Sequence, residues 1–143
     1  MDKISILFRN YKNVDSGLLL TRFVFGFFMV YNHGIGKIFG GPERWERLGS
    51  ALTNIIGFES LQLFFGLMAS LSESIFSTFI ILGLLTRISA SLLGFTMFIA
   101  SLKHIMKFEL PEMAIIYLTF SVLIIVAGPG KYSIDNMILK KLK

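Results

Sequence analysis

The chain has 143 residues and a formal net charge of +5; 54% of its residues are hydrophobic and only 16% are charged. A soluble domain of this size has a large surface for its volume and ordinarily contains about 25% charged residues, so the composition argues against a soluble protein. The sequence contains no cysteine, which excludes disulfides and thiol redox chemistry within the chain, and its two histidines predict no metal site.

Four apolar blocks follow one another and predict four transmembrane helices. They cover residues 17–39, 61–85, 88–106 and 111–127. A helix needs about 20 residues to cross a hydrocarbon core of about 30 Å; the first and last blocks reach this length only if flanking Lys and Arg side chains extend to the interface. The expected fold is all-α: an antiparallel four-helix transmembrane bundle made by a single membrane domain, residues 1–143.

Two shorter helices are expected outside the spans. Gly-Gly-Pro at 40–42 ends the first block, and residues 43–54 then place Trp45 and two leucines on one face. This pattern predicts a short interfacial helix between transmembrane helices 1 and 2, with the indole at headgroup level. Gly-Pro-Gly at 128–130 predicts a turn, followed by a short amphipathic tail helix.

Basic residues outside the spans predict the orientation, because cytoplasmic loops are enriched in Lys and Arg. The side of the N-terminus would carry Lys3, Arg9, Lys12, Arg87, Lys131, Lys140, Lys141 and Lys143. The opposite side would carry Lys37, Arg44, Arg47, Lys103 and Lys107. Both termini are therefore expected in the cytoplasm. Because basic residues flank apolar blocks and no nucleic-acid-reading motif occurs, membrane lipid rather than nucleic acid is the expected partner.

Arg22 and Glu73 are charges deep within the predicted spans. An unpaired charge at the bilayer centre costs about 2.5–3.5 kcal/mol on insertion scales, so such residues are expected to face the protein interior and find partners. If helices 1 and 2 are antiparallel, Glu73 lies at a height between Arg22 and His33. This predicts an interaction of Glu73 with Arg22; the alternative is that the buried pair only fixes helix register.

Helical spacing places polar and small residues of three helices on inward faces that are expected to converge on one cavity. The three faces are Arg22, Gly26, Met29, His33 and Lys37; Gln62, Gly66, Ala69, Glu73, Ser77 and Ile80; and Ala90, Gly94, Met97, Ser101 and His104. The candidate pocket or substrate-binding residues are Arg22, His33, Lys37, Glu73, His104 and Glu112. Among these, Glu73 and His33 are the candidate catalytic residues. Taken alone, His33 also fits a structural role as a histidine at the membrane interface whose ring nitrogens are hydrogen-bonded.

An ordered set of short motifs extends along nearly the whole chain. It consists of Arg22, His33-Gly34-x-x-Lys37, Glu73, Gly83-Leu84-Leu85-Thr86-Arg87 and Gly128-Pro129-Gly130-Lys131-Tyr132-Ser133-Ile134-Asp135. Together with the four apolar blocks, this set resembles the DoxX family of small bacterial membrane proteins. The resemblance implies a multi-pass protein of the bacterial inner membrane with an oxidoreductase role. Related proteins include a subunit of a thiosulfate:quinone oxidoreductase and members of membrane complexes linked to redox defence.

The leading hypothesis is a subunit of a quinone-linked membrane oxidoreductase, with a quinone as the candidate cofactor. Arg22, His33 and Lys37 could donate to the quinone oxygens, and Glu73 could pass a proton. Electrons would come from redox partner proteins or a diffusible donor, because the chain has no cysteine. The alternative is a non-catalytic membrane scaffold or a lipid- or small-molecule-binding subunit of a redox complex. A transporter is least favoured, because four short helices would need a homo-oligomer to form a pathway.

Overall fold

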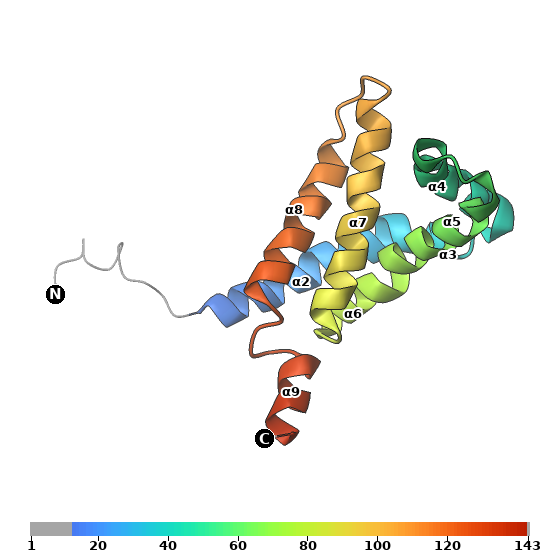
Figure 1. Ribbon diagram of the computed structural model, residues 1–143. Coiled ribbons are helices and arrows are strands. Elements are labelled where there is room, and N and C mark those ends of the chain that lie inside the picture. The colour runs from blue at the N-terminus through green and yellow to red at the C-terminus, as the bar shows by residue number, and fades with distance from the viewer. Residues whose placement is uncertain (1–12, 143) are drawn as a thin grey trace, which may run out of the picture.

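The computed structural model describes residues 13–142, and all regular elements in that part of the chain are helical (Figure 1). In chain order they are α2 (Val14–Met29), η1 (Val30–Gly34), α3 (Ile35–Ile38), α4 (Gly41–Ile56), η2 (Glu59–Leu61), α5 (Gln62–Leu71), η3 (Ser72–Phe76), α6 (Ser77–Leu82), α7 (Thr86–Ile105), α8 (Glu112–Ala127) and α9 (Ile134–Lys141). The basic residues Lys3, Arg9, Lys12 and Lys143, which entered the orientation argument, lie outside the described residues.

Three helical stretches are long and apolar enough to cross a membrane: Val14–Ile38, Glu59–Leu82 and Thr86–Ile105. The fourth apolar helix, α8, is shorter, with 16 residues. The first stretch is longer than its uninterrupted apolar run because η1 and α3 continue α2 without a break to Ile38. The described part of the chain is thus all-helical, with three to four helices suited to span a membrane.

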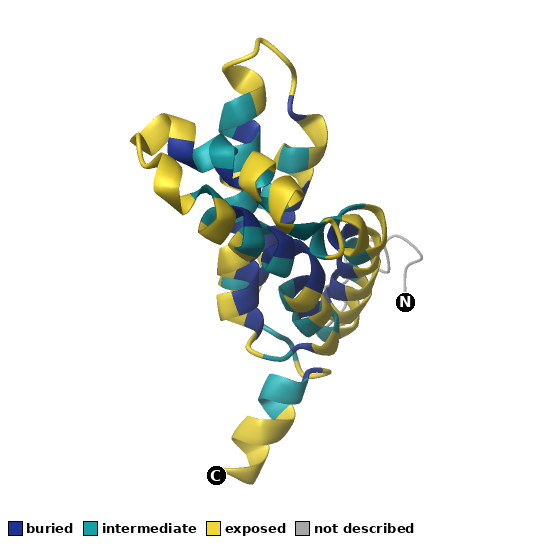
Figure 2. Ribbon diagram, turned by 90° about the vertical axis from the view of Figure 1, so that its right-hand side faces the viewer, coloured by how far each residue is buried: buried dark blue, intermediate teal, exposed yellow. Residues whose placement is uncertain are grey.

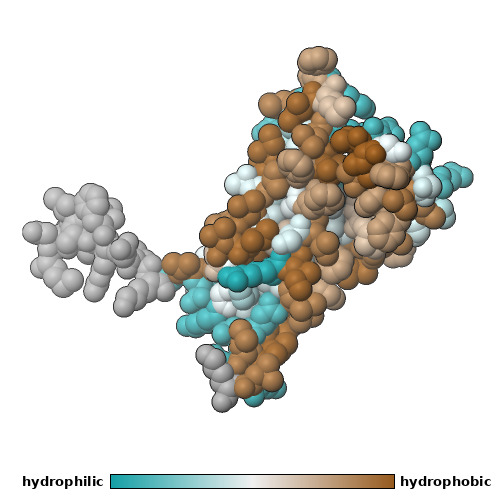
Figure 3. Space-filling model, in the orientation of Figure 1, coloured by the Kyte–Doolittle hydropathy of each residue, from teal (hydrophilic) through white to brown (hydrophobic). Residues whose placement is uncertain are grey.

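Many polar side chains are buried and many large apolar side chains are exposed, a distribution unlike that of a soluble protein. Ser77 is fully buried and Glu73 is 2% exposed, whereas Phe23 and Phe64 are each 54% exposed. Figure 2 shows the buried residues where the helices meet, and Figure 3 shows hydrophobic side chains over much of the visible surface. Buried hydroxyls bond to their own helix, as Ser70 Oγ does to Gly66 O at 2.9 Å. This pattern suits a lipid environment.

The apolar helices pack in two pairs. α2 packs against α6, and α7 packs against α8; the two pairs cross in the view of Figure 1. Gly26 permits the first contact, because a Cβ there would lie 2.4 Å from Ile81 Cγ1. Between the pairs, the ring of Phe25 stacks on Phe120 at 4.7 Å between centroids. The buried apolar core joins both pairs and consists of Leu18, Met29, Ile80, Ala90, Leu93, Met97, Tyr117, Phe120 and Ile124.

Helix α4 folds back along α5, with the two backbones in close contact. A Cβ on Gly66 would lie 1.6 Å from Trp45 O, and a Cβ on Gly49 would lie 1.8 Å from Gln62 O. Only glycine fits at either position, because backbone atoms cannot move aside as a flexible side chain can. The helix extends beyond the range 43–54 expected from the sequence. Its apolar face meets α5, and α4 thereby supplies one wall of the cavity described below.

Candidate functional site

The first two spanning stretches each contain a π-helical turn, and these turns contact each other. At the contact, a Cβ on Gly34 in η1 would lie 2.3 Å from the carbonyl oxygen of Glu73 in η3. A π turn accommodates one more residue than an α turn, and such turns are frequent at functional sites. The extra residue changes which side chains face inward. Gly34 is buried, whereas His33 is only half-buried.

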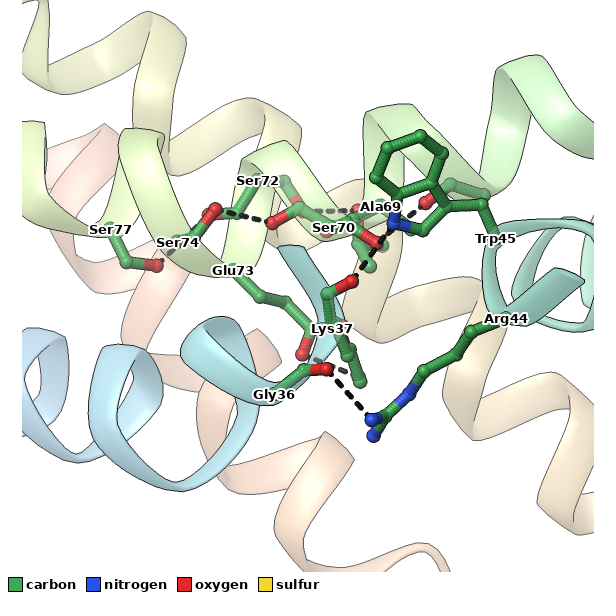
Figure 4. Close-up of polar contacts among 12 residues, drawn as sticks. Gly36, Lys37, Arg44, Trp45, Ala69, Ser70, Ser72, Glu73, Ser74 and Ser77 are labelled. Atoms are coloured by element: carbon green, nitrogen blue, oxygen red, sulfur yellow. Dashed lines mark hydrogen bonds and ion pairs between the residues drawn. The ribbon is translucent and has the colours of Figure 1, made fainter. Parts of the chain in front are cut away.

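Beside this contact, Lys37 and Glu73 form an ion pair (Figure 4). The Lys37 ammonium donates to both carboxylate oxygens of Glu73, at 2.6 Å to Oε1 and 2.5 Å to Oε2. The Glu73 side chain is 3% exposed and that of Lys37 is 20% exposed. A carboxylate this deeply buried depends on its cation, because an isolated buried charge loses its hydration without compensation.

Helix α4 fixes the backbone that carries Lys37. The Trp45 indole N–H donates to Lys37 O at 2.9 Å, and the Arg44 guanidinium donates to Gly36 O at 2.7 Å (Figure 4). Both acceptors belong to α3, and Lys37 O also accepts from Gly40 N at 3.1 Å, so the two side chains add to the hydrogen bonds at the end of this helix. The two side chains therefore hold α3 at the angle from which Lys37 reaches Glu73.

A cavity of about 220 Å³ adjoins the ion pair, between α4, α5 with η3, and α7. Most of its lining is apolar, and the residues are Leu48, Gly49, Ala51, Leu52, Phe65, Met68, Ala69, Phe95, Ile99 and Ala100, together with the polar Lys37, Glu73, Thr96, Lys103 and His104. A bond of 2.8 Å between Ser72 Oγ and Thr96 Oγ1 holds η3 against α7. The volume exceeds the roughly 150 Å³ of an engineered cavity that binds benzene, so one ring can enter.

The structure brings together three of the six predicted pocket residues. Lys37, Glu73 and His104 line the cavity. His33 lies elsewhere, with its ring edge-to-face on Tyr117 at 5.9 Å between centroids. Glu112 is exposed in the first turn of α8.

The sixth residue, Arg22, does not pair with Glu73, so that predicted interaction is wrong. Its guanidinium donates through Nη2 to the carbonyl oxygen of Tyr132, and its residue is 1% exposed. The reason is the path of the chain after α8. The segment following Gly128 returns to the start of α2 and occupies the space beside Arg22, where Lys131 N donates to Asp15 Oδ1 at 2.8 Å.

The same returning segment caps α7. The Asp135 carboxylate accepts from the backbone N–H groups of Leu85 at 2.8 Å and Thr86 at 2.9 Å, and from Thr86 Oγ1 at 2.7 Å. Asp135 N in turn donates to Gly83 O at 2.9 Å. A carboxylate at a helix N-terminus satisfies donors that have no partner within the helix. The motifs at 83–87 and 128–135 therefore contact each other and have a structural role, away from the cavity.

Sequence reasoning missed the cavity wall made by Leu48 and Leu52. Their spacing with Trp45 predicted an apolar helical face, and the structure places Leu48 and Leu52 at the cavity beside α5. Gly49 and Gly66 were the available signal, because paired small residues on two helices permit close backbone contact.

The comparison with protein families gives one match. The family model of DoxX matches residues 17–105, more than half of the chain. This region includes Lys37, Glu73 and His104, and it ends before the segment that caps α7. Neither the curated proteins nor the solved structures gave a match. The ordered motifs, the apolar helices and the family match agree: the chain belongs to the DoxX family.

Proposed function

We propose that this DoxX-family membrane protein is a subunit of a quinone-linked oxidoreductase and binds a quinone ring in the cavity beside Lys37 and Glu73. The observation that carries the proposal is a buried ion pair at the polar end of an otherwise apolar cavity. Ligand sites in proteins commonly combine apolar walls with a few convergent polar groups.

The pair has the two capacities that a quinone site needs. Reduction of a quinone to a quinol takes two electrons and two protons. The Lys37 ammonium can donate a hydrogen bond to one quinone oxygen, and the Glu73 carboxylate can take up or release a proton beside it. The electrons come from a redox partner protein or a diffusible donor. A pair that only fixed helix register would be expected within packed side chains, whereas this one borders a cavity.

For the membrane arrangement, we propose an antiparallel four-helix bundle in the bacterial inner membrane, with α8 as the fourth span and α4 at the interface. At about 1.5 Å per residue, the 16 residues of α8 cover about 24 Å, so flanking side chains complete the crossing. Contacts of Asp15 with Lys131 and of Asp135 with Leu85 support both termini on one side. That side is proposed to be cytoplasmic. Membrane lipid, redox partners and a second copy of the chain are the proposed partners.

The test is quinone binding by the purified protein in lipid nanodiscs. A short-chain ubiquinone analogue is expected to bind wild type, and Glu73→Gln and Lys37→Met are each expected to weaken binding about tenfold or more. His33→Gln is the control, because His33 lies outside the cavity, and its affinity should stay within about twofold of wild type. Unchanged affinity in both cavity variants would refute the proposed site, and absence of quinone binding by wild type would refute the function.

The second candidate is a non-catalytic subunit that holds a small molecule or lipid. The cavity alone favours it, since a volume of about 220 Å³ can hold a ligand without turnover. Mass spectrometry of ligands retained in mild detergent distinguishes the two functions. A bound quinone supports the oxidoreductase subunit, whereas a bound non-redox molecule together with a stoichiometric partner protein supports the scaffold.

A further inference from the structure

The cavity lining has an excess of positive charge. Of its charged residues, Lys37 and Glu73 neutralise each other. His104 also lines the cavity, but its ring Nδ1 is 2.6 Å from Glu109 Oε2. Lys103 is the remaining charged residue, and no carboxylate within the described residues 13–142 lies within 4.0 Å of its ammonium. A cation beside apolar walls attracts an anion more strongly than it would in water, because the local dielectric constant is lower.

Lys103 lies at the opposite end of the cavity from Glu73. The bond between Ser72 and Thr96 places Glu73 level with Thr96 on α7. From Thr96 to Lys103 the helix rises seven residues, or about 10 Å at 1.5 Å per residue. The apolar side chains of Ile99 and Ala100 lie between the two ends. A ring seated there would have Lys37 and Glu73 at its inner edge, and the flexible Lys103 stem could reach its outer edge.

We propose that the cavity selects a lipophilic ring anion, with the ionised oxygen of the ligand at Lys103 and the ring between the apolar walls. The inference rests on the proposed function and narrows its ligand to quinones that carry an ionised ring hydroxyl. The volume favours one ring system over the two acyl chains of a phospholipid, because it exceeds a benzene-binding cavity only modestly. Lys103 is thus a specificity-determining residue for the charge of the ligand.

A matched pair of probes tests this selection. At neutral pH 2-hydroxy-1,4-naphthoquinone is an anion, and 2-methoxy-1,4-naphthoquinone is a neutral ring of similar shape. Binding is followed by quenching of Trp45, the only tryptophan, in nanodiscs of phosphatidylcholine. Wild type is expected to bind the anion about tenfold more tightly, which corresponds to about 1.4 kcal/mol. Lys103→Gln should lower affinity for the anion more than affinity for the neutral ring and so remove the preference, and Lys103→Arg should keep it.

Lys107→Gln is the matched control, because Lys107 is outside the cavity lining, and it should retain the preference. Equal binding of the two probes by wild type, or a preference that survives Lys103→Gln, would overturn this inference and leave the proposed function standing. If neither probe nor the ubiquinone analogue binds, the proposed function itself fails.

Discussion

Removing one member of the Lys37–Glu73 pair is expected to destabilise the protein more than replacing both. Lys37→Met would leave the Glu73 carboxylate, 3% exposed, without its cation. Breaking a fully buried pair costs about 3–5 kcal/mol, and replacing both partners with apolar groups is often neutral. Because the Lys37 side chain is 20% exposed, we expect a smaller loss, about 2–3 kcal/mol, for Lys37→Met.

The double variant Lys37→Met/Glu73→Leu should lie within about 1 kcal/mol of wild type, because neither charge remains buried. The expected coupling energy between the two positions is then at least about 1 kcal/mol plus the loss that Glu73→Leu causes alone. The assay is reversible unfolding in mixed micelles with increasing denaturing detergent, followed by Trp45 fluorescence. The four proteins of this double-mutant cycle are wild type, the two single variants and the double variant. Each is measured at the same lipid-to-detergent ratio, because this ratio sets the reference state for unfolding.

The exposed pair of His104 and Glu109 supplies the control, since the side chains are 50% and 54% exposed. Glu109→Gln should change stability by less than about 1 kcal/mol, as exposed ion pairs generally do. If the losses of the two single variants add in the double variant, Lys37 and Glu73 are not coupled and the reasoning is refuted. A large loss for Glu109→Gln would show that the assay responds to any lost charge.

Three further variants test the contacts around the site. Gly34→Ala places a Cβ 2.3 Å from the Glu73 carbonyl oxygen. This overpacking should lower the free energy of unfolding by about 1–3 kcal/mol and weaken quinone binding. A Tm equal to that of wild type would contradict the contact between η1 and η3. Gly66→Ala should separate α4 from α5 and shift the emission maximum of Trp45. Gly17→Ala is the control and should leave the spectrum unchanged, because a Cβ there meets nothing within 4 Å. Equal spectra for the two variants would count against close packing of α4 on α5. Asp135→Ala should lower stability by about 0.5–2 kcal/mol, because α7 loses its N-terminal cap. Thermal unfolding measures this loss. Unchanged stability would mean that water replaces the carboxylate.

The helices were largely predictable from the sequence because lipid imposes a simple rule: a spanning segment must be apolar and must pair its own backbone groups. Four apolar blocks and the glycine–proline breaks were therefore sufficient to locate the stretch Val14–Ile38, α7 and α8 to within a few residues. The inward position of Glu73 was also predictable, because a charge at that depth needs protein around it.

The partner of Glu73 was not predictable, for two physical reasons. A π turn in each of the first two spanning stretches changes the phase of the helix, so α-helical spacing from Arg22 places His33 toward Glu73, where the structure has Gly34. The second reason is tertiary: Trp45 and Arg44 hold the last turn of α3 so that Lys37 points back toward Glu73. The contacts of Trp45 and Arg44 with α3 leave no periodic pattern in the sequence.

The hydrogen bond from Arg22 to Tyr132 links the family-matched region to the C-terminal segment. Arg22 lies within the region that matches the family, whereas its hydrogen-bond partner Tyr132 lies 27 residues beyond the end of that region. A fragment that stopped at residue 105 would carry a guanidinium into the bilayer with no acceptor from the C-terminal segment. The buried guanidinium of the matched region therefore meets this acceptor only after the chain has been synthesised beyond residue 132.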